Sequence, residues 1–211
     1  MNNHSSEPHG PAATRKSSDK YQRILDAAIG VIAEKGYWQA RVSEIAERAG
    51  VADGTIYLYY KNKEQLLMAA IDSAFAAFME RARRELAGLT DPRERLHRLA
   101  FVHLDMLGAN RELAIVFQTE LRQSARFLME FSRHRLVEYF EMIRDIVRDG
   151  QANGQFRADL SDKIAANCFF GAVDEMVTSW ILSERDYPLA GAADAVVGLI
   201  LRGMETNPGS R

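Results

Sequence analysis

The stretch from Val42 to Lys63, VSEIAERAGVADGTIYLYYKNK, predicts two short helices joined by a tight turn. Ile45 and Ala49 lie four residues apart and share one apolar face of the first helix. Gly50 follows directly and can adopt the left-handed conformation that ends a helix. Asp53 then lies where an N-cap belongs, because its carboxylate can accept hydrogen bonds from the free amides of the next turn. This pattern predicts a helix-turn-helix.

The composition of the second helix favours DNA as its partner. Ile56 and Tyr60 lie four residues apart on the face expected to point inward, while polar and aromatic side chains cover the other sides. An ordinary helical hairpin has the same turn, but it would not expose Thr, Tyr and Lys together. Hydroxyl and ammonium groups suit phosphate oxygens, and such a helix enters the major groove. The residues expected to face the groove, hold phosphate or support this helix are Arg41, Ser43, Ala52, Gly54, Thr55, Tyr57, Leu58, Tyr59, Tyr60 and Lys63.

The run from Ile24 to Leu67 resembles the DNA-binding domain of the TetR-type bacterial repressors. The resemblance is carried by Ile45-Ala46, Ala49-Gly50-Val51, Gly54-Thr55-Ile56-Tyr57, Tyr59-Tyr60 and Lys61-Asn62-Lys63-Glu64. The chain departs from the family at Arg41-Val42, where a threonine usually caps the helix and touches phosphate. We expect this cap to fall to Ser43 or to water. The resemblance implies a repressor that binds double-stranded DNA at a palindromic operator.

Length and composition are those of a soluble protein with room for one small and one larger domain. The chain has 211 residues, of which 47% are hydrophobic and 27% charged. Its formal net charge is -2, so DNA affinity must come from dimerisation and from the local placement of Lys and Arg. The single cysteine, Cys168, lies in an apolar run. It rules out a disulfide within the chain, and we expect it to be inert core.

The first 18 residues are polar and lack the apolar segment of a secretory signal. We expect a flexible N-terminal arm over residues 1–18, a helix-turn-helix DNA-binding domain over 19–66, and a ligand-binding and dimerisation domain over 67–211. No apolar run approaches the roughly 20 residues of a membrane span. The sequence therefore predicts a cytoplasmic protein with no membrane partner.

Helical periodicity continues through the chain, and no stretch alternates as a strand would. The first helix is expected from Asp19 to Lys35, ending at Gly36, with Trp38 packed behind it. Gly150 and Asn153-Gly154 are expected to end a long later helix. The remaining helices are expected at 63–87, 92–107, 113–121, 125–149, 161–183 and 187–204. The fold class is all-α: a three-helix DNA-binding domain and a larger helical domain.

The last two helices, residues 161–204, carry more apolar surface than one domain would bury. The first is apolar on nearly every side between Ile164 and Trp180, which is unusual for a helix that is wet on one side. Two copies could cover this surface by forming a four-helix bundle, which also places two reading helices on one face of DNA. We expect a homodimer, with Gly171 and Val197 in its interface. The alternative is a helix buried in a monomer core.

The larger domain is rich in aromatic and methionine side chains at helical spacing. Such residues form either plain core or the lining of an adaptable apolar cavity, and the pattern leaves both open. Glu120, Asp174 and Glu175 must be paired if they are buried, and we expect an arginine partner for at least one. The candidate ligand-binding residues are Phe101, Leu104, Leu107, Phe117, Glu120, Leu121, Arg122, Phe140, Phe170, Val173, Met176, Val177 and Trp180.

Two stretches, 113–124 and 170–180, resemble the fatty-acid-responsive subgroup of the same family, the FadR-type repressors. The resemblance implies that long-chain acyl-coenzyme A is the effector and that its binding releases DNA and derepresses fatty-acid degradation. Each buried methylene would contribute about 0.8 kcal/mol. The phosphates of coenzyme A need cations at the cavity mouth, and Arg122 is the first choice. The other candidates are Arg81, Arg84, Arg98, Arg126 and Arg133.

No catalytic residue, metal site or cofactor is expected. His97, His103 and His134 are scattered, and HExxH, CxxC, GxSxG and a glycine-rich phosphate loop do not occur. Two alternatives stay open. A repressor of the same build could sense hydrophobic drugs, which a cavity mouth without basic residues would favour. A helical acyl-binding carrier without a DNA role would be favoured by failure to bind double-stranded DNA at low salt.

Overall fold

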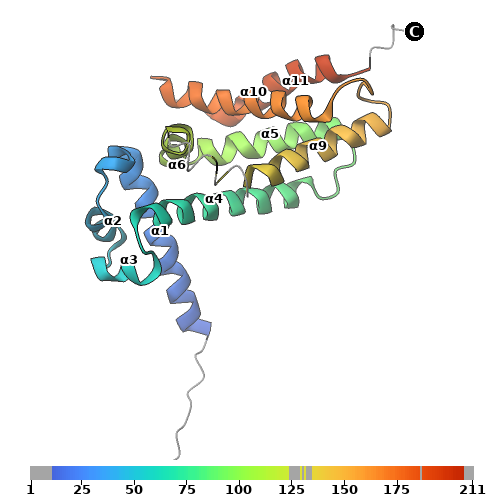
Figure 1. The fold of residues 1–211 in the computed structure, drawn as a ribbon. Coiled ribbons are helices and arrows are strands. Elements are labelled where there is room, and N and C mark those ends of the chain that lie inside the picture. Colours follow the sequence, from blue (N-terminus) through green and yellow to red (C-terminus); the bar gives the residue numbers. More distant parts are fainter. Residues whose placement is uncertain (1–10, 124–128, 130, 132–134, 186, 207–211) are drawn as a thin grey trace, which may run out of the picture. The chain divides into compact units, whose positions relative to one another are not determined.

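The computed structural model describes residues 11–123, 129, 131, 135–185 and 187–206, and only the backbone of 11–18. These residues form helices joined by short turns, with one isolated β-bridge between Phe156 and Glu205, which confirms the all-α class (Figure 1). The helices are α1 (Pro11–Gln39), α2 (Val42–Ala49), α3 (Asp53–Tyr59), α4 (Lys63–Leu86), α5 (Pro92–Gly108), α6 (Arg111–Ile115), the π-helix η1 (Val116–Glu120), α7 (Leu121–Gln123), α9 (Val137–Ala152), α10 (Asp162–Leu182), the 3-10 helix η3 (Leu189–Ala192) and α11 (Ala193–Met204). None of these helices combines the length and the apolar character that a bilayer span requires.

The chain divides into two compact units, Met1–Ala70 and Ile71–Arg211. In the first unit, α1, α2 and α3 pack around an aliphatic core. Ile24, Ile45 and Ile56, one from each helix, are at most 1% exposed. Gly50 has a φ of 66°, and its amide bonds to the carbonyl of Glu47, so α2 ends where the sequence predicted.

Three helix starts differ from expectation. α1 begins at Pro11 rather than near Asp19, because proline is favoured at the first helical position and alanines follow it. Arg41 is the N-cap of α2, and its amide donates to Oε2 of Glu44 at 3.0 Å, so Glu44 satisfies this end rather than Ser43. Asp53 is the first residue of α3 rather than its cap, and its charge there still suits the helix dipole.

In the second unit, α10 and α11 lie side by side as a layer over α5 and α9 (Figure 1). Two of these helices begin with a side-chain cap. Asp91, followed by Pro92, accepts from the amide of Arg93 at 2.9 Å, and Ser161 accepts from the amide of Ile164 at 3.4 Å. These local bonds set where α5 and α10 begin, and so fix which of their side chains face inward.

The helix predicted at 113–121 is interrupted. It consists of α6, the wider η1 and then α7, and the hydroxyl of Thr119 donates to the carbonyl of Ile115 at 2.7 Å within it. A π-helical turn displaces the side chains that follow and often occurs at functional sites. The helix predicted at 125–149 lies partly outside the described residues, and α9 is the part that the structure describes.

Of the two predicted ends of this helix, Asn153-Gly154 is confirmed, but Gly150 does not end α9. The helix continues to Ala152, and the ring of Phe156 packs against Gly150 so closely that a Cβ there would lie 2.1 Å from the ring Cδ2. The amide of Phe156 also donates to the carbonyl of Gly150 at 2.9 Å. The glycine is therefore needed for close packing inside the helix. The turn comes later, at Gly154, whose φ is 78°.

Candidate functional site

The helix α3 presents large apolar and aromatic side chains to solvent. Leu58 is 82% exposed, Tyr57 56% and Tyr59 46%. Three consecutive exposed side chains of this kind indicate an interaction surface. The other predicted contacts on this part of the first unit are also exposed or half-exposed, namely Arg41, Ser43, Ala52, Gly54 and Thr55. The surface matches the sequence prediction of a helix that reads DNA.

Tyr60 and Lys63 lie inside this unit instead. Tyr60 is 7% exposed, its ring lies 6.1 Å from that of Tyr21, and burial raises the pKa of its hydroxyl. The Lys63 ammonium donates to the carbonyls of Tyr37 and Ala40, the latter at 2.8 Å, and burial lowers its pKa. Both residues therefore support the reading helix rather than face a phosphate. Support of this helix was one of the roles that the sequence predicted for them.

Trp38 is exposed, contrary to the prediction that it packs. Its side chain is 86% exposed and meets only the edge of the Tyr37 ring, with the ring centroids 5.3 Å apart. Lys63 explains this arrangement, because its ammonium holds the carbonyls on both sides of Trp38 and lies 4.5 Å from the Tyr37 ring centroid. Tyr37 is packed inward by this contact, and Trp38 projects from the turn.

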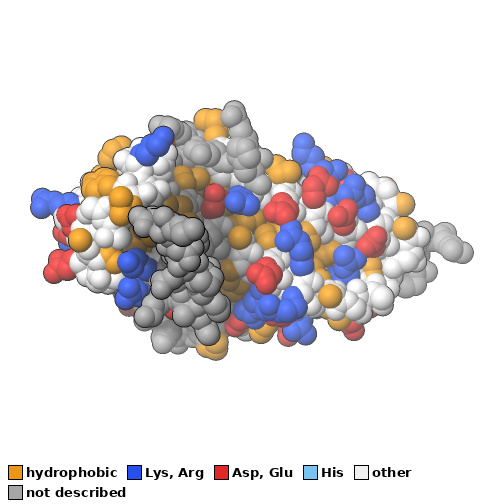
Figure 2. Space-filling view, turned by 90° about the horizontal axis from the view of Figure 1, so that it is seen from below, with side chains coloured by type: hydrophobic (Ala, Val, Ile, Leu, Met, Phe, Trp, Pro, Cys, Tyr) orange, Lys and Arg blue, Asp and Glu red, His pale blue; other side chains and the backbone are white. Residues whose placement is uncertain are grey.

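The surface of the second unit seen in Figure 2 carries interspersed basic and acidic side chains. The ion pairs explain this mixture: Arg95 pairs with Asp149 at 2.5 Å, and Arg148 with Asp145 at 2.7 Å. Charges that are neutralised in pairs do not attract a polyanion. This face of the second unit is therefore a weaker candidate for a nucleic-acid interface than the exposed face of α3.

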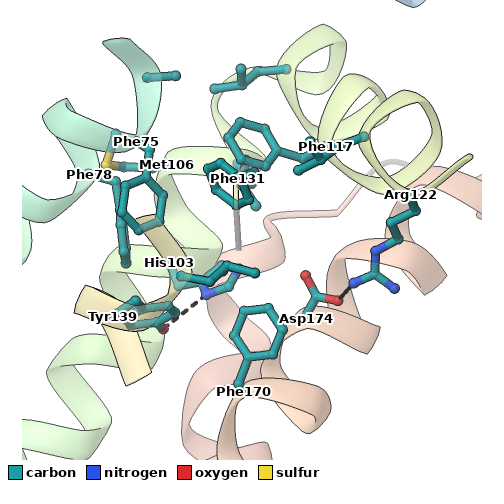
Figure 3. A pocket seen from close by; sticks show the side chains of 15 residues that line it. Phe75, Phe78, His103, Met106, Phe117, Arg122, Phe131, Tyr139, Phe170 and Asp174 are labelled. Carbon is teal, nitrogen blue, oxygen red and sulfur yellow. Dashed lines mark hydrogen bonds and ion pairs between the residues drawn. The ribbon is translucent and has the colours of Figure 1, made fainter. Parts of the chain in front are cut away.

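The second unit encloses an apolar cavity of about 300 Å³ (Figure 3). Rings from several elements surround it: those of Phe78 and Tyr139 lie 5.0 Å apart, and those of Phe75 and Phe131 5.2 Å apart, both edge to face. A cavity of this size and lining suits the hydrocarbon part of a ligand. Its lining residues are Ala74, Phe75, Phe78, His103, Met106, Leu107, Leu113, Phe117, Leu121, Arg122, Phe131, Leu136, Tyr139, Phe170 and Asp174.

Two of the polar lining residues are hydrogen-bonded to each other. Nδ1 of His103, on α5, lies 3.0 Å from the hydroxyl of Tyr139, on α9. Burial lowers the pKa of His103 to about 4, against the opposing charge of Asp174, and burial also raises the pKa of Tyr139. Both side chains are therefore neutral at physiological pH.

Asp174, on α10, is the centre of a second polar group at the cavity. Its carboxylate pairs with the guanidinium of Arg122 and accepts from Nε2 of Gln118 at 2.8 Å. The hydroxyl of Thr178 donates to Oε1 of Gln118 at 3.3 Å. The Asp174 side chain is 13% exposed and that of Arg122 46%. Arg122 thus links a buried carboxylate to solvent, and the expected arginine partner for an acidic residue is confirmed.

Five of the predicted ligand-binding residues line the cavity, namely Leu107, Phe117, Leu121, Arg122 and Phe170. The other predicted positions do not. Leu104, Val173 and Val177 are completely buried core, and the indole N–H of Trp180 donates to the carbonyl of Tyr187. Phe101 borders a separate surface hollow beside Arg98. Glu120, Phe140 and Met176 are likewise absent from the lining, because periodicity identifies a buried face but not the part of it that opens onto a cavity.

Sequence reasoning missed the wall that α4 and α9 contribute. Phe75 and Phe78 of α4 and Tyr139 of α9 line the cavity, and none of them was among the predicted ligand-binding residues. His103 lies four residues before Leu107 on α5, a spacing that places both on one face and could have revealed it. Arg126, Arg133 and His134 lie outside the described residues.

Two further expectations concern single side chains. Cys168 is exposed rather than buried, because it lies on the outer face of α10. Among the other arginines proposed for a ligand, Arg81 is already paired with Glu85 at 2.6 Å and with Asp105 at 2.7 Å. Among the candidate arginines that the structure describes, Arg122 both lines the cavity and reaches solvent.

The two units match two protein families. Residues 24–70 match the family of bacterial regulatory proteins called tetR, and residues 71–203 match the C-terminal region of YsiA-like proteins. The fatty acid metabolism regulator protein of Bacillus subtilis (strain 168) is 37% identical over 190 residues, which cover 90% of this chain and 98% of that protein.

Two solved structures resemble the chain over most of its length. The fatty acid degradation regulator FadR from Bacillus halodurans is 38% identical, with a TM-score of 0.81, over 90% of this chain and 100% of the other. FadR from Bacillus subtilis, in complex with stearoyl-CoA, is also 38% identical, with a TM-score of 0.82, over 87% of this chain and 98% of the other.

Proposed function

Because this chain belongs to the tetR family of bacterial regulatory proteins, we propose that it is a dimeric repressor that a long-chain acyl-coenzyme A releases from its operator. The observation that carries this proposal is the cavity of about 300 Å³, in which aromatic side chains surround the space and Arg122 connects it to solvent. The chain is a helix-turn-helix transcriptional regulator rather than an enzyme, as its family shows. The genes that it controls would be those of fatty-acid degradation, in the bacterial cytoplasm.

The exposed face of α3 supports the DNA-binding half of the proposal. Tyr57, Leu58 and Tyr59 project from a short helix whose opposite side is anchored by Ile56. Tyrosine hydroxyls suit phosphate oxygens, and an apolar side chain such as Leu58 suits a thymine methyl. Arg41 and Ser43 are exposed at the start of α2, where they would hold the DNA backbone.

Two exposed apolar stripes support the dimer. On α10, Ile164 is 60% exposed and Leu182 77%, with the exposed Gly171 between them on the same side of the helix. On α11, Leu199 is 70% exposed. Packing both helices against those of a second copy would cover these side chains and create a two-fold molecule that fits a palindromic operator.

The chemistry of the cavity supports an acyl-coenzyme A effector. Each buried methylene contributes about 0.8 kcal/mol, so a chain of a dozen carbons supplies ample affinity. The basic residue at the edge of the cavity, Arg122, suits the phosphates of coenzyme A and argues against a cationic drug. The related FadR that binds stearoyl-CoA is consistent with this ligand class.

Release of DNA requires that the effector bind more tightly to a conformation that cannot bind the operator. The continuous helix α4 is the element on which we expect both events to act. It begins at Lys63, whose ammonium holds the turn before α2, and it carries Ala74, Phe75 and Phe78 on the cavity wall. An acyl chain that displaces these rings would tilt α4 and with it the reading helices.

A gel-shift experiment tests the function. An operator is first selected from random double-stranded DNA at low salt, and palmitoyl-CoA is then titrated into the complex. We expect release by palmitoyl-CoA for the native chain. Release by cationic dyes alone would favour a drug-sensing repressor, and failure to select any DNA would favour an acyl carrier.

Two tryptophan variants of α4 locate the effector. Ala74 lines the cavity, whereas Ala77, on the same helix, is exposed. Ala74→Trp fills space that the acyl chain would occupy, so this variant should hold the operator at palmitoyl-CoA concentrations that release the native protein. Ala77→Trp, the matched control, should release normally. Equal release of both variants would show that the effector binds elsewhere.

A further inference from the structure

A polar row crosses one side of the otherwise apolar cavity. Tyr139, His103 and Asp174 follow one another along it, and Arg122 lies at its far end (Figure 3). The four side chains come from α9, α5, α10 and α7, so their meeting is a property of the packed unit. The rings of Phe117 and Phe131 lie across the cavity from this row, whereas Phe78 and Phe170 pack against His103 and Tyr139. A pure hydrocarbon ligand would not need such a row, because buried polar groups stabilise a fold only when they are satisfied.

The His103–Tyr139 pair retains one donor hydrogen. A neutral imidazole carries one N–H and a neutral phenol one O–H, so the pair holds two such hydrogens. Their mutual bond, between Nδ1 and the hydroxyl at 3.0 Å, uses one of them, whichever tautomer is present. In the part of the chain that the structure describes, neither side chain makes a second hydrogen bond, and the bonds to the Asp174 carboxylate come from Gln118 and Arg122. The remaining hydrogen therefore needs an acceptor.

We infer that this hydrogen binds the thioester carbonyl of the acyl group, which makes His103 and Tyr139 the residues that select an acyl thioester. The inference rests on the proposed function. The carbonyl oxygen is a neutral acceptor, it is the one acceptor on the acyl side of the sulfur, and it lies between the hydrocarbon and the coenzyme. Arg122, with its side chain 46% exposed, then faces the coenzyme end, and the rings of Phe75 and Phe78 face the chain.

The same arrangement discriminates against two related ligands. A thioether has no carbonyl, so it would leave the buried donor unsatisfied on binding. A free fatty acid would bring its carboxylate into a buried site near that of Asp174, where like charges are unfavourable. The burial of His103, which keeps it neutral, prevents it from offsetting that charge. The site thus prefers the neutral thioester over both.

Calorimetric titration of the full-length chain tests the inference with palmitoyl-CoA and S-hexadecyl-CoA, the thioether of equal chain length that lacks the carbonyl. The native chain should bind the thioester on the order of tenfold more tightly, the effect of one neutral hydrogen bond and of the donor otherwise left unsatisfied. In the double variant His103→Leu/Tyr139→Phe, which removes both hydrogens, the two ligands should bind equally. Phe117→Leu, the control, alters the apolar lining at a ring that packs against Phe131, and it should weaken both ligands while keeping their ratio.

A measurement on the native chain alone guards against a double variant that does not fold. With ¹³C at the carbonyl, the infrared C=O stretch of bound palmitoyl-CoA should lie at lower frequency than that of equally labelled S-ethyl thiopalmitate in hexane, as a hydrogen-bonded carbonyl requires. Equal affinity of the native chain for both ligands, or an unshifted stretch, would overturn the inference and leave the proposed function intact. Binding of neither ligand would overturn the proposed function and the inference with it.

Discussion

The ammonium of Lys63 shows how a residue in a DNA-binding motif can act within the fold. It donates to the carbonyls of Tyr37 and Ala40, and to that of Trp38 at 3.4 Å. These are the last carbonyls before α2, so the side chain holds the turn that presents Arg41. A charged donor among neutral carbonyls forms stronger hydrogen bonds than a neutral one.

Lys63→Met should therefore lower the free energy of unfolding by about 1–3 kcal/mol, the range for hydrogen bonds to a charged group. Urea denaturation measures this loss. The salt dependence of operator binding should keep its slope, because no phosphate contact is removed. A slope reduced by about one, the signature of a lost phosphate contact, would show instead that Lys63 touches DNA. Lys61→Met, at an exposed position nearby, is the control for stability.

His103 should make the protein less stable in mild acid. Its pKa is lowered by burial to about 4 in the folded chain, from an ordinary value of 6.5. Its contribution to stability is therefore complete above pH 6.5 and is lost as the pH falls from there toward 4, because the unfolded chain then binds a proton that the folded chain excludes. The loss is at most about 1.4 kcal/mol per pH unit.

Urea denaturation at pH 7, 6 and 5 measures that loss. His103→Gln should show a smaller fall in the free energy of unfolding over this range than the native chain. His97→Gln leaves His103 in place and should behave as the native chain does. If the free energy of unfolding falls equally with pH for the native chain and His103→Gln, then His103 takes up its proton freely in the folded state.

At the scale of the element, α9 depends on a glycine within its last turns. Phe156 is 1% exposed and its ring occupies the space that a side chain at Gly150 would need. Gly150→Ala should destabilise the protein by about 1–3 kcal/mol, the usual cost of overpacking, although alanine is the better helix former. Gly191→Ala, where no atom lies within 4 Å of the added Cβ, should have little effect. Thermal unfolding compares the two, and a Gly150→Ala protein as stable as the native one would contradict this account of the packing.

The two sides of α3 should respond differently to truncation. Ile56→Ala removes a side chain that is 1% exposed and should lower stability by about 2–4 kcal/mol. Leu58→Ala removes a side chain that is 82% exposed and should leave stability unchanged. It should weaken binding to the selected operator by about tenfold, or about 1.4 kcal/mol. Denaturation and gel shift measured on both variants separate the roles. Undiminished operator binding by Leu58→Ala would exclude it from the interface.

At the scale of the whole molecule, the dimer is best tested by substituting residues that are exposed in a single protomer. Val197 was expected in the interface, but it is completely buried within its own unit, so a charge there would unfold the chain. Leu199→Arg, at a position 70% exposed, should instead yield folded monomers by light scattering. Operator affinity should fall steeply, because a palindromic site needs two linked reading helices.

Val137→Arg is the matched control for this variant. Val137 is 54% exposed but lies on α9, outside the proposed interface. It should remain dimeric and bind the operator normally. Dimers of Leu199→Arg with native operator affinity would place the interface elsewhere on the second unit.

Local interactions explain why much of the molecule could be predicted from the sequence. The end of α2 at Gly50, the caps at Asp91 and Ser161, and the inward positions of Ile45 and Ile56 all depend on residues within a few positions of one another. The resemblance that identified the reading helix likewise depends on residues that are close together in the sequence. The exposure of Trp38, in contrast, depends on Lys63, which lies 25 positions away and holds the neighbouring carbonyls.

The sequence by itself determined the helical class, the helix-turn-helix and the exposed reading surface, because these follow from spacing and capping along one segment. Only the tertiary structure decided which apolar side chains are core and which enclose a cavity. Leu104 and Leu107 have the same chemistry on the same helix, yet one is completely buried and the other lines the cavity. The meeting of His103 with Tyr139, 36 positions away, was likewise invisible to periodicity. A cavity is the space left by helices that are distant in sequence, so its walls exist only once those helices have packed.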